Sequence, residues 1–242
     1  MKSLTIIGVG PGDPSLLTLA AVDAIQESTV VSYPVSVLGG ESLAQKIASK
    51  WITEDKQKLP LHFPMVDDLN TLKNAWRAAG NELMKMVENG ERVVFLAQGD
   101  ISFFSTGSYM SKELEKYHPE YLVKLIPGVT SFSTAAAKSK LPLAFREEQV
   151  LVAPVPDTPQ ELKAILSEAA LMKRVVVLLK LGKKWTWVKF LLKELDLLES
   201  SIFAERVGFS DQQIVQASDL TSENITYFSL LMIRQSWPLI MP

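Results

Sequence analysis

Three glycines crowd the first turn of the chain, where chemistry at a strand end is expected. The turn at 8–14, GVGPGDP, directly follows the apolar run Leu4–Val9. Glycine permits positive φ and close approach of the backbone to another group, and Pro11 stiffens the turn. Asp13 before Pro14 predicts a helix N-cap and first helical position. A strand, a glycine turn and a helix N-terminus form a common ligand-binding unit, and a plain strand-to-helix connection is the alternative.

Two familiar nucleotide-binding motifs do not fit this turn. The dinucleotide-binding pattern G-x-G-x-x-G requires glycine where Asp13 stands, and a carboxylate near the end of the second strand. The second apolar run, Thr29–Tyr33, instead ends in Ser32-Tyr33-Pro34. A phosphate-binding P-loop requires Gly-Lys-Ser/Thr after the turn, and this chain has none there.

Two further loops follow apolar runs and complete a pattern. The run 93–97 leads into QGDISFFS at 98–105, and the run 122–126 leads into PGVTS at 127–131. In this order and spacing, the three loops resemble those of the tetrapyrrole (corrin/porphyrin) methylases, S-adenosylmethionine-dependent enzymes of cobalamin and sirohaem synthesis. The resemblance extends over essentially the whole chain. One position departs from it, because Ile101 stands where the family usually has proline.

Three later segments make the chain most similar to the precorrin-2 C20-methyltransferases within that family: Leu141–Glu148, Glu205–Gly208 and Tyr227–Leu231. The resemblance implies methyl transfer from S-adenosyl-L-methionine to C20 of precorrin-2 or of its cobalt-containing counterpart. The alternatives are uroporphyrinogen III, another precorrin position, or a modified histidine on a protein as in diphthine synthase. Ala144-Phe145-Arg146 argues against uroporphyrinogen III, whose enzymes usually have Thr-His-Arg there. A non-catalytic nucleotide- or tetrapyrrole-binding protein is a further alternative, favoured by Ile101.

The resemblance also implies a set of site residues. The methyl donor is expected to contact Pro11, Gly99, Asp100, Ile101, Phe104, Thr130, Ser131, Leu181 and Val207. Asp100 or a water molecule is the expected proton acceptor. For Asp100 the alternative is a turn carboxylate that bonds its own backbone, and for the Thr130-Ser131 pair it is a helix N-cap.

A carboxylate-rich tetrapyrrole needs charged hydrogen-bond donors and flat surfaces. We predict substrate contacts at Arg146 and Arg206, because both lie in the segments that carry the resemblance and arginine offers a planar fork of donors. Further cations stand at Lys180, Lys183 and Lys184. Lys183 and Lys184 are better interpreted as solvated charges. Tyr33, Phe103 and Phe104 are candidates for stacking on the macrocycle or on adenine, with core packing as the alternative.

Composition excludes several functional classes. The 242 residues carry a net charge of −2, which gives no overall attraction for nucleic acid. Without cysteine, and with only His62 and His118, the chain has no disulfide or thiolate ligand, and we expect no metal. No apolar stretch is long enough for a bilayer, and no signal peptide precedes the first strand, so a cytoplasmic protein without membrane contact is expected.

Apolar periodicity predicts alternating strands and helices, and therefore an α/β fold. Strands are expected at 4–9, 29–33, 93–97, 122–126, 150–153, 174–181, 202–206 and 227–233. Helices are expected at 14–27, 41–51, 67–89, 106–117, 131–140, 158–171 and 184–197. The family resemblance implies two α/β domains with the donor in a cleft between them, and a homodimer. With Pro127-Gly128 as hinge, we expect domains over 1–127 and 128–242.

Overall fold

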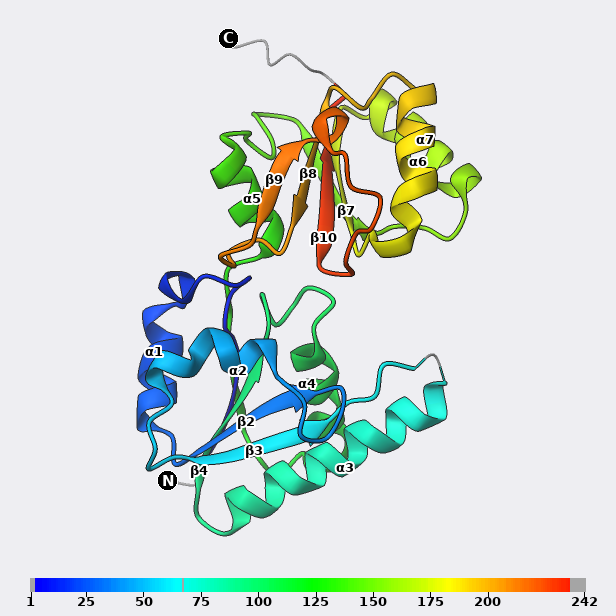
Figure 1. Cartoon of the computed structure of the whole chain (residues 1–242). Helices are drawn as coiled ribbons and strands as arrows, with labels where there is room; N and C mark the ends of the chain where they lie inside the picture. Colours follow the sequence, from blue (N-terminus) through cyan, green and yellow to red (C-terminus); the bar gives the residue numbers. More distant parts are fainter. Residues whose placement is uncertain (1–2, 67, 236–242) are drawn as a thin grey trace. The chain divides into compact units, whose positions relative to one another are not determined.

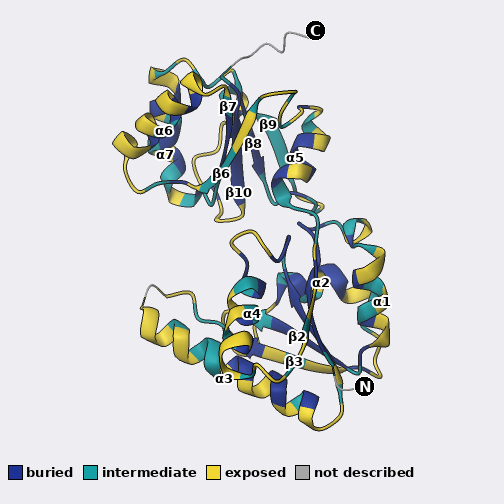
Figure 2. Ribbon diagram, turned by 180° about the vertical axis from the view of Figure 1, so that it is seen from behind, coloured by how far each residue is buried: buried dark blue, intermediate teal, exposed yellow. Residues whose placement is uncertain are grey.

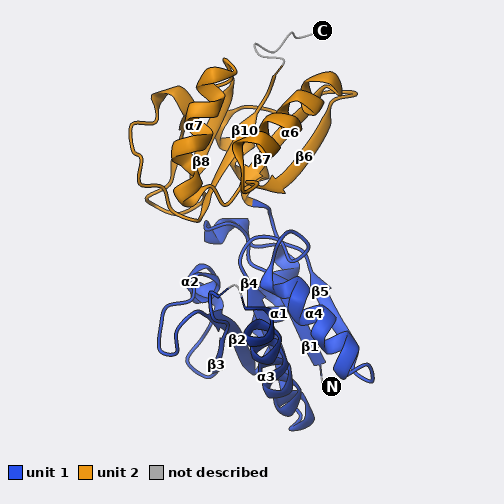
Figure 3. Cartoon of the chain, turned by 90° about the vertical axis from the view of Figure 1, so that its right-hand side faces the viewer, with its two compact units in different colours: residues 1–130 blue, residues 131–242 orange. Residues whose placement is uncertain are grey.

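The computed structural model describes residues 3–66 and 68–235, which form two compact units (Figures 1 and 3). Unit 1 spans Met1–Thr130 and unit 2 spans Ser131–Pro242. The sequence places the boundary three residues earlier, between residues 127 and 128. The later boundary has a local cause: the Gly128 N–H still donates to the Asp100 carboxylate, at 2.8 Å, and so belongs with unit 1.

Unit 1 is built on a parallel sheet of five strands. These are β1 (Ser3–Gly8), β2 (Val30–Val35), β3 (Gln57–His62), β4 (Arg92–Ala97) and β5 (Val123–Ile126). Their order in the sheet is β3-β2-β4-β1-β5. In the register of the central strands, Ile6 of β1 lies beside Phe95 of β4 and Leu125 of β5. Because every pairing is parallel, the carboxyl ends of all five strands meet at one edge.

Four α-helices cover this sheet: α1 (Leu19–Glu27), α2 (Leu43–Ala48), α3 (Leu69–Glu88) and α4 (Thr106–Tyr117). Leu83 of α3 and Met110 of α4 share one buried cluster with Ile6 and Phe95. Figure 2 shows buried residues both in the strands of this sheet and in the helices that flank it. The helices α1 and α2 pack against β1, β2 and β4 through residues outside that cluster, such as Ile25. This arrangement is expected for a parallel sheet whose two faces are both buried.

The first helix begins later than the sequence predicts. Asp13 does act as an N-cap, since its carboxylate accepts from Ser15 N at 2.9 Å, but it caps only a 3-10 turn, Pro14–Leu16. Leu17 is extended and interrupts the helix. The α-helix starts after Thr18, whose hydroxyl accepts from Ala21 N at 3.2 Å. The predicted start at Pro14 is therefore wrong, because two caps compete and the second one opens α1.

Unit 2 contains a mixed sheet in the order β6-β7-β10-β8-β9. Its strands are β6 (Gln149–Pro154), β7 (Arg174–Leu179), β8 (Ser201–Glu205), β9 (Gln213–Gln216) and β10 (Ser229–Ile233). Its helices are α5 (Ser131–Ser139), α6 (Pro159–Leu171) and α7 (Trp185–Glu194). Only β6 and β7 are parallel neighbours, and β10 runs antiparallel to both β7 and β8. Short 3-10 turns lie at Gly182–Lys184 and Ala217–Asp219 in unit 2, and a further one lies at Ser49–Trp51 in unit 1.

The core of unit 2 confirms that β7 is a central strand. Val176 packs in one cluster with Leu166 of α6 and Val188 of α7. The next residue, Val177, packs in a second cluster with Phe132 of α5. Successive side chains of β7 are therefore buried on opposite faces, as its continuous apolar run predicts.

The α/β fold is confirmed, but two edge strands escape sequence analysis. β3 has the sequence QKLPLH and carries Pro60, which removes a backbone donor and is tolerated at a sheet edge. β9 is a four-residue strand, QIVQ, at the edge of the other sheet. The predicted start of the third helix at residue 67 lies outside the described residues, and α3 itself follows an Asp68 N-cap. Within residues 3–66 and 68–235, no helix has the length and apolarity needed to cross a membrane.

Candidate functional site

The three loops predicted from the sequence meet at the carboxyl edge of the unit 1 sheet. They follow β1, β4 and β5, which are neighbours in the order β4-β1-β5. Gly10 N donates to Gly99 O at 3.1 Å, and Gly99 N donates to Gly10 O at 2.8 Å. The first two loops are therefore joined by a small antiparallel bridge beyond the ends of their parallel strands.

Glycine is required where the third loop crosses the other two. A Cβ atom at Gly8 would lie 2.7 Å from both Gly128 N and Gly99 O. A Cβ atom at Gly128 would lie 2.7 Å from the carbonyl carbon and oxygen of Gly8. These obstacles are backbone atoms, which cannot rotate away as a side chain can. The sequence indicated glycines for backbone freedom, and the structure adds that two of them permit three backbones to touch.

Asp100 ties the second loop to the third. One carboxylate oxygen accepts from Ser102 N at 2.8 Å and from the Ser102 hydroxyl, and the other accepts from Gly128 N at 2.8 Å. Burial raises the pKa of Asp100, but the bonds from Ser102, Gly128 and the Ile101 backbone outweigh it and hold the pKa below its ordinary value of 3.8. The turn-carboxylate interpretation of Asp100 therefore describes a real contact, and this carboxylate also fixes a neighbouring loop.

Gly99 and Ile101 show which parts of this loop are accessible. Gly99 has φ +72°, and a Cβ atom there would meet nothing within 4 Å. Its N–H and C=O are both bonded to Gly10, so it offers a ligand close approach to its Cα. The Ile101 side chain is buried in the unit 1 core with Met110, while its carbonyl accepts from the Ser108 hydroxyl. Replacement of the usual proline by isoleucine thus changes a core contact.

The other residues predicted to contact the donor in unit 1 lie around the same loops. Pro11 is buried, and its carbonyl accepts from Gln98 Nε2 at 3.4 Å. Thr130 directly precedes Ser131, the first residue of α5, and so stands at the predicted N-cap position. Phe103 and Phe104 are 44% and 46% exposed, so core packing is the wrong interpretation for both rings.

The second group of predicted residues lies at one edge of the unit 2 sheet. Lys180 and Arg206 follow β7 and β8 and flank the start of β10, because Lys180 N donates to Ser229 O and Arg206 N to Phe228 O, both at 2.9 Å. Lys180 and Arg206 have backbone φ angles of +64° and +49°, in the left-handed region that residues other than glycine rarely adopt. Such strain concentrates at functional sites.

Aromatic rings accompany these two cations. The Tyr227 and Phe228 rings meet edge to face at 5.5 Å, and Lys180 Nζ lies 5.4 Å from the Tyr227 ring centre. Arg206 Nε donates to Asp211 at 2.6 Å. Leu181 and Val207 are at the same edge, with their side chains buried in the two clusters of unit 2. This edge thus combines cations with half-exposed aromatic surface, which suits a flat polyanion.

Arg146 does not lie at that edge. It precedes β6, which runs parallel to β7 with Gln149 beside Arg174, so the Arg146 loop lies at the opposite edge of the sheet. A strand of this length spans about 20 Å, so Arg146 and Arg206 cannot hold the same carboxylate. Tyr33 lies inside β2 and is 9% exposed, and burial raises the pKa of its hydroxyl. This position favours core packing over stacking on a ligand.

Several polar residues have structural partners, and for Lys184 these partners show that its interpretation as a solvated charge is wrong. Lys184 Nζ donates to the carbonyls of Val155 and Pro156, at 3.0 and 3.1 Å, and to Asp157. His62 bonds the Ser36 carbonyl, and His118 bonds the Asn81 amide. Lys183 is exposed. In the part of the chain that the structure describes, no three His, Cys, Asp or Glu side chains are placed to hold a metal ion.

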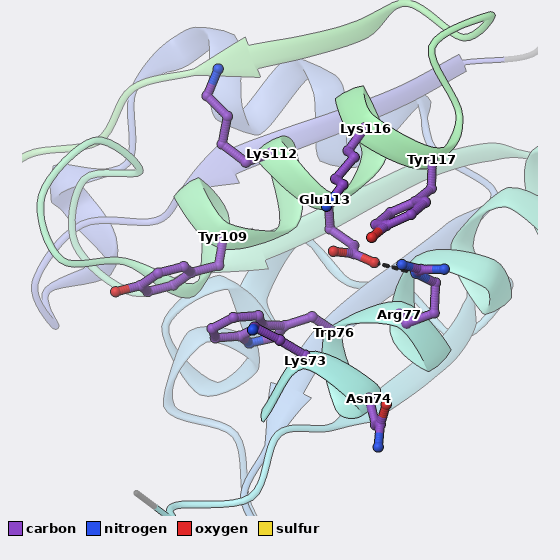
Figure 4. Close-up of a pocket in the computed structure, with 9 residues that line it drawn as sticks. All are labelled: Lys73, Asn74, Trp76, Arg77, Tyr109, Lys112, Glu113, Lys116 and Tyr117. Atoms are coloured by element: carbon purple, nitrogen blue, oxygen red, sulfur yellow. Dashed lines mark hydrogen bonds and ion pairs between the residues drawn. The ribbon is translucent and has the colours of Figure 1, made fainter. Parts of the chain in front are cut away.

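A separate groove of about 490 Å³ lies between α3 and α4 (Figure 4). The Trp76 and Tyr109 rings stack there at 4.7 Å with an angle of 6°. Arg77 Nε pairs with Glu113 at 2.5 Å (Figure 4). The lining residues are Lys73, Asn74, Trp76, Arg77, Tyr109, Lys112, Glu113, Lys116 and Tyr117. None of them comes from the three glycine loops, so the groove is distinct from the loop edge.

Comparison with known proteins decides the family. The chain matches the sequence model of the tetrapyrrole (corrin/porphyrin) methylases over residues 3–220. The chain belongs to this family. Among tetrapyrrole methylases, a cobalt-precorrin-2 C(20)-methyltransferase of Salmonella typhimurium is 28% identical over 236 residues, covering 97% of each protein.

Solved structures show the same fold. The methyltransferase CobJ gives a TM-score of 0.70 at 21% identity, covering 99% of this chain and 97% of that one. Uroporphyrin-III C-methyl transferase from Thermus thermophilus, complexed with S-adenosyl homocysteine, gives a TM-score of 0.63 at 19% identity. That alignment covers 96% of this chain and 97% of the other. The two-unit α/β architecture is therefore that of the tetrapyrrole methylases.

Proposed function

We propose that this tetrapyrrole methylase transfers the methyl group of S-adenosyl-L-methionine to C20 of precorrin-2, with or without cobalt. The observation that carries the proposal is the match to the Salmonella cobalt-precorrin-2 enzyme over 97% of both chains. The three interlocked loops and the cationic aromatic edge of unit 2 supply surfaces that suit the two reactants. A homodimer completes the proposal on family resemblance alone, and cytoplasmic location completes it as an expectation from the sequence.

The methyl transfer requires no nucleophilic side chain and no strong base from the protein. The donor supplies a methyl group already activated on a sulfonium; C20 forms a bond to that carbon, the sulfur–carbon bond breaks, and S-adenosylhomocysteine leaves. The hydrogen of C20 departs as a proton. Correct placement of two such reactants is worth on the order of 7–11 kcal/mol, more than a typical general base contributes. A chain with no cysteine and two histidines is therefore chemically sufficient.

The loop edge of unit 1 is the proposed donor surface. Gly99 faces open space, so a ligand can approach the backbone closely, and the crossing of Gly8, Gly99 and Gly128 keeps that backbone rigid. This surface suits the donor, because methyl transfer from a sulfonium requires neither a metal nor a reactive side chain. The predicted donor contacts of Pro11 and Phe104 belong to the same loops.

For Asp100 the geometry favours positioning over proton transfer. Both carboxylate oxygens are occupied by hydrogen bonds, and the lowered pKa makes this group a weaker base. We propose that Asp100 holds the loop in the shape that binds the donor and that water accepts the C20 proton.

The edge of unit 2 at the start of β10 is the proposed substrate surface. Asp211 orients Arg206 by accepting from its Nε at 2.6 Å, and the two terminal nitrogens of Arg206 are proposed to bind a substrate carboxylate as a fork. Lys180 adds a second cation beside the Tyr227 ring. Arg146 is proposed to contact a different part of the macrocycle, since it lies at the opposite edge of the sheet.

A non-catalytic binding protein loses its support. Ile101 was the feature that favoured it, and the structure buries this side chain in the core of unit 1. The open position beside the loop backbone is at Gly99, where an added Cβ atom would meet nothing within 4 Å.

The test uses the purified full chain, methyl-labelled donor, and three acceptors: precorrin-2, cobalt-precorrin-2 and uroporphyrinogen III. We expect label to enter one or both precorrin-2 forms, with NMR placing the new methyl group on C20. Label at another carbon, or transfer to uroporphyrinogen III alone, would move the protein to another activity of the family. Donor binding without transfer to any acceptor would support a binding protein.

A further inference from the structure

We infer that Arg234 and Glu148 form a clamp that positions the Arg146 loop for the tetrapyrrole. Arg234 stands immediately after β10 and is 1% exposed. Its Nη1 donates to Pro142 O at 2.9 Å and Leu143 O at 3.2 Å, and its Nη2 donates to both Glu148 carboxylate oxygens at 2.5 and 2.6 Å. Both terminal nitrogens of Arg234 therefore bond residues of one loop, 142–148. The inference rests on the proposed function, in which Arg146 contacts substrate.

The clamp fixes the loop on both sides of Arg146. Upstream it holds the carbonyls of Pro142 and Leu143, and downstream it holds the Glu148 carboxylate. Glu148 in turn accepts from Phe145 N at 2.7 Å, and the Arg234 guanidinium lies 5.5 Å from the Phe145 ring. Arg146 and Glu147 are thus the two exposed residues between the anchored Phe145 and Glu148.

Arg146 itself has φ +47°, which an arginine adopts only when its surroundings enforce it. Here the bonds of Phe145 and Glu148 provide that enforcement. An exposed arginine in a fixed, unusual backbone conformation is suited to present its fork in one direction, which a flexible loop would not do.

A purely stabilising role explains the clamp less well. A buried ion pair is weak evidence for stability, because removing two charges from water is costly. In addition, Arg234 Nε has no hydrogen-bond partner within residues 3–66 and 68–235, so the burial is not fully compensated there. Buried charges of this kind are best attested where they specify one conformation among several. The conformation specified here is that of residues 142–148.

The experiment compares Glu148→Gln, Arg234→Lys and Arg146→Lys with Glu194→Gln. The last is a control for the substitution itself, because it makes the same change at a more exposed ion pair, to Lys163 at 3.2 Å, elsewhere in unit 2. Glu148→Gln removes the charge that Nη2 binds and leaves the shape of the side chain. Arg234→Lys keeps the charge and loses the fork.

The measurements are kcat and KM for the tetrapyrrole, affinity for S-adenosylhomocysteine, and hydrogen exchange of the loop amides. We expect Glu148→Gln and Arg234→Lys to lower kcat/KM about tenfold, like Arg146→Lys, and to leave donor affinity within about twofold. Exchange of the Phe145 amide should accelerate in the two clamp variants only. The double variant Arg146→Lys/Glu148→Gln should be no worse than either single change, because both act through one contact.

Three results would overturn the inference. Unchanged kcat/KM in the clamp variants, beside a clear loss in Arg146→Lys, would remove the clamp from substrate binding. Equal losses for donor and tetrapyrrole, or a comparable loss in Glu194→Gln, would make its role general stability. The third result is faster exchange of the Phe145 amide in the clamp variants beside unchanged kcat/KM in Arg146→Lys. It would show that Arg234 and Glu148 hold the loop but that Arg146 does not contact the tetrapyrrole. Absence of methyl transfer in the unmodified protein refutes the proposed function separately.

Discussion

The substitution Gly99→Ala tests whether the donor approaches the second glycine loop. Gly99 has φ +72° and faces open space, so the added Cβ atom meets no protein atom within 4 Å and costs only backbone strain. For an alanine in the left-handed region that strain is about 1–2 kcal/mol. If the donor occupies the open space, the Cβ atom also displaces it, and we expect at least a tenfold loss of affinity, about 1.4 kcal/mol.

Gly90→Ala is the matched control. Gly90 has φ +94°, and a Cβ atom there also meets nothing within 4 Å, so the same strain applies. It precedes β4, whereas Gly99 follows it, which separates the two positions by about 20 Å of strand. The two variants should lose similar stability in urea unfolding and differ in their binding of S-adenosylhomocysteine, measured by calorimetry. Equal affinity in both variants would assign the Gly99 loop to the scaffold and refute the proposed donor surface.

Five further outcomes are expected. Gly128→Ala should destabilise unit 1 by more than Gly99→Ala in the same urea assay, because its Cβ atom meets backbone rather than open space. Asp100→Asn should lower stability by about 1–3 kcal/mol and weaken donor binding, and a fall in kcat alone would instead identify Asp100 as the base. Because the folded pKa of Asp100 is lowered, its contribution is present above its unfolded pKa and lost as pH falls through the folded value, so acid unfolding curves of the wild type and Asp100→Asn should converge at low pH. Calorimetry with a chelator should leave S-adenosylhomocysteine affinity unchanged, and sedimentation at micromolar concentration should give a two-chain mass, where a loss of binding or a clean monomer would contradict these two expectations.

Of the strands that the structure describes, the sequence predicts all the central ones but only two of the four edge strands, β5 and β6. Val175–Leu178 is buried on both faces of the sheet, and such a run has few alternatives to a central strand. Pro60 in β3 and the short β9 give no comparable signal, because an edge strand can contain proline and needs only one buried face. At the first helix, Asp13 and Thr18 are both good N-caps, and only packing decides between them.

In the candidate site, too, the sequence predicts features that depend on one segment and misses contacts between segments that are distant in the chain. Gly10, Gly99 and Asp100 can be selected from sequence because each stands in a loop after an apolar strand. The contact between Gly8 and Gly128 cannot, since it depends on how three loops cross. In the sequence, Arg146 and Arg206 both stand in loops next to predicted strands. The directions of those strands nevertheless place the two residues at opposite edges of one sheet.

The interlocked loops explain how the chain tolerates its most conspicuous departure from the family pattern. The resemblance implies proline at position 101, which would stiffen the loop, but the loop is already fixed by the Gly10–Gly99 bridge on one side and by Asp100 on the other. With its shape set by these contacts, residue 101 is left to fill the core, where isoleucine packs with Met110. The donor surface then depends on the backbone around Gly99 and on the bonds that hold it. A substitution that breaks those bonds should therefore harm donor binding more than one that changes the side chain at 101.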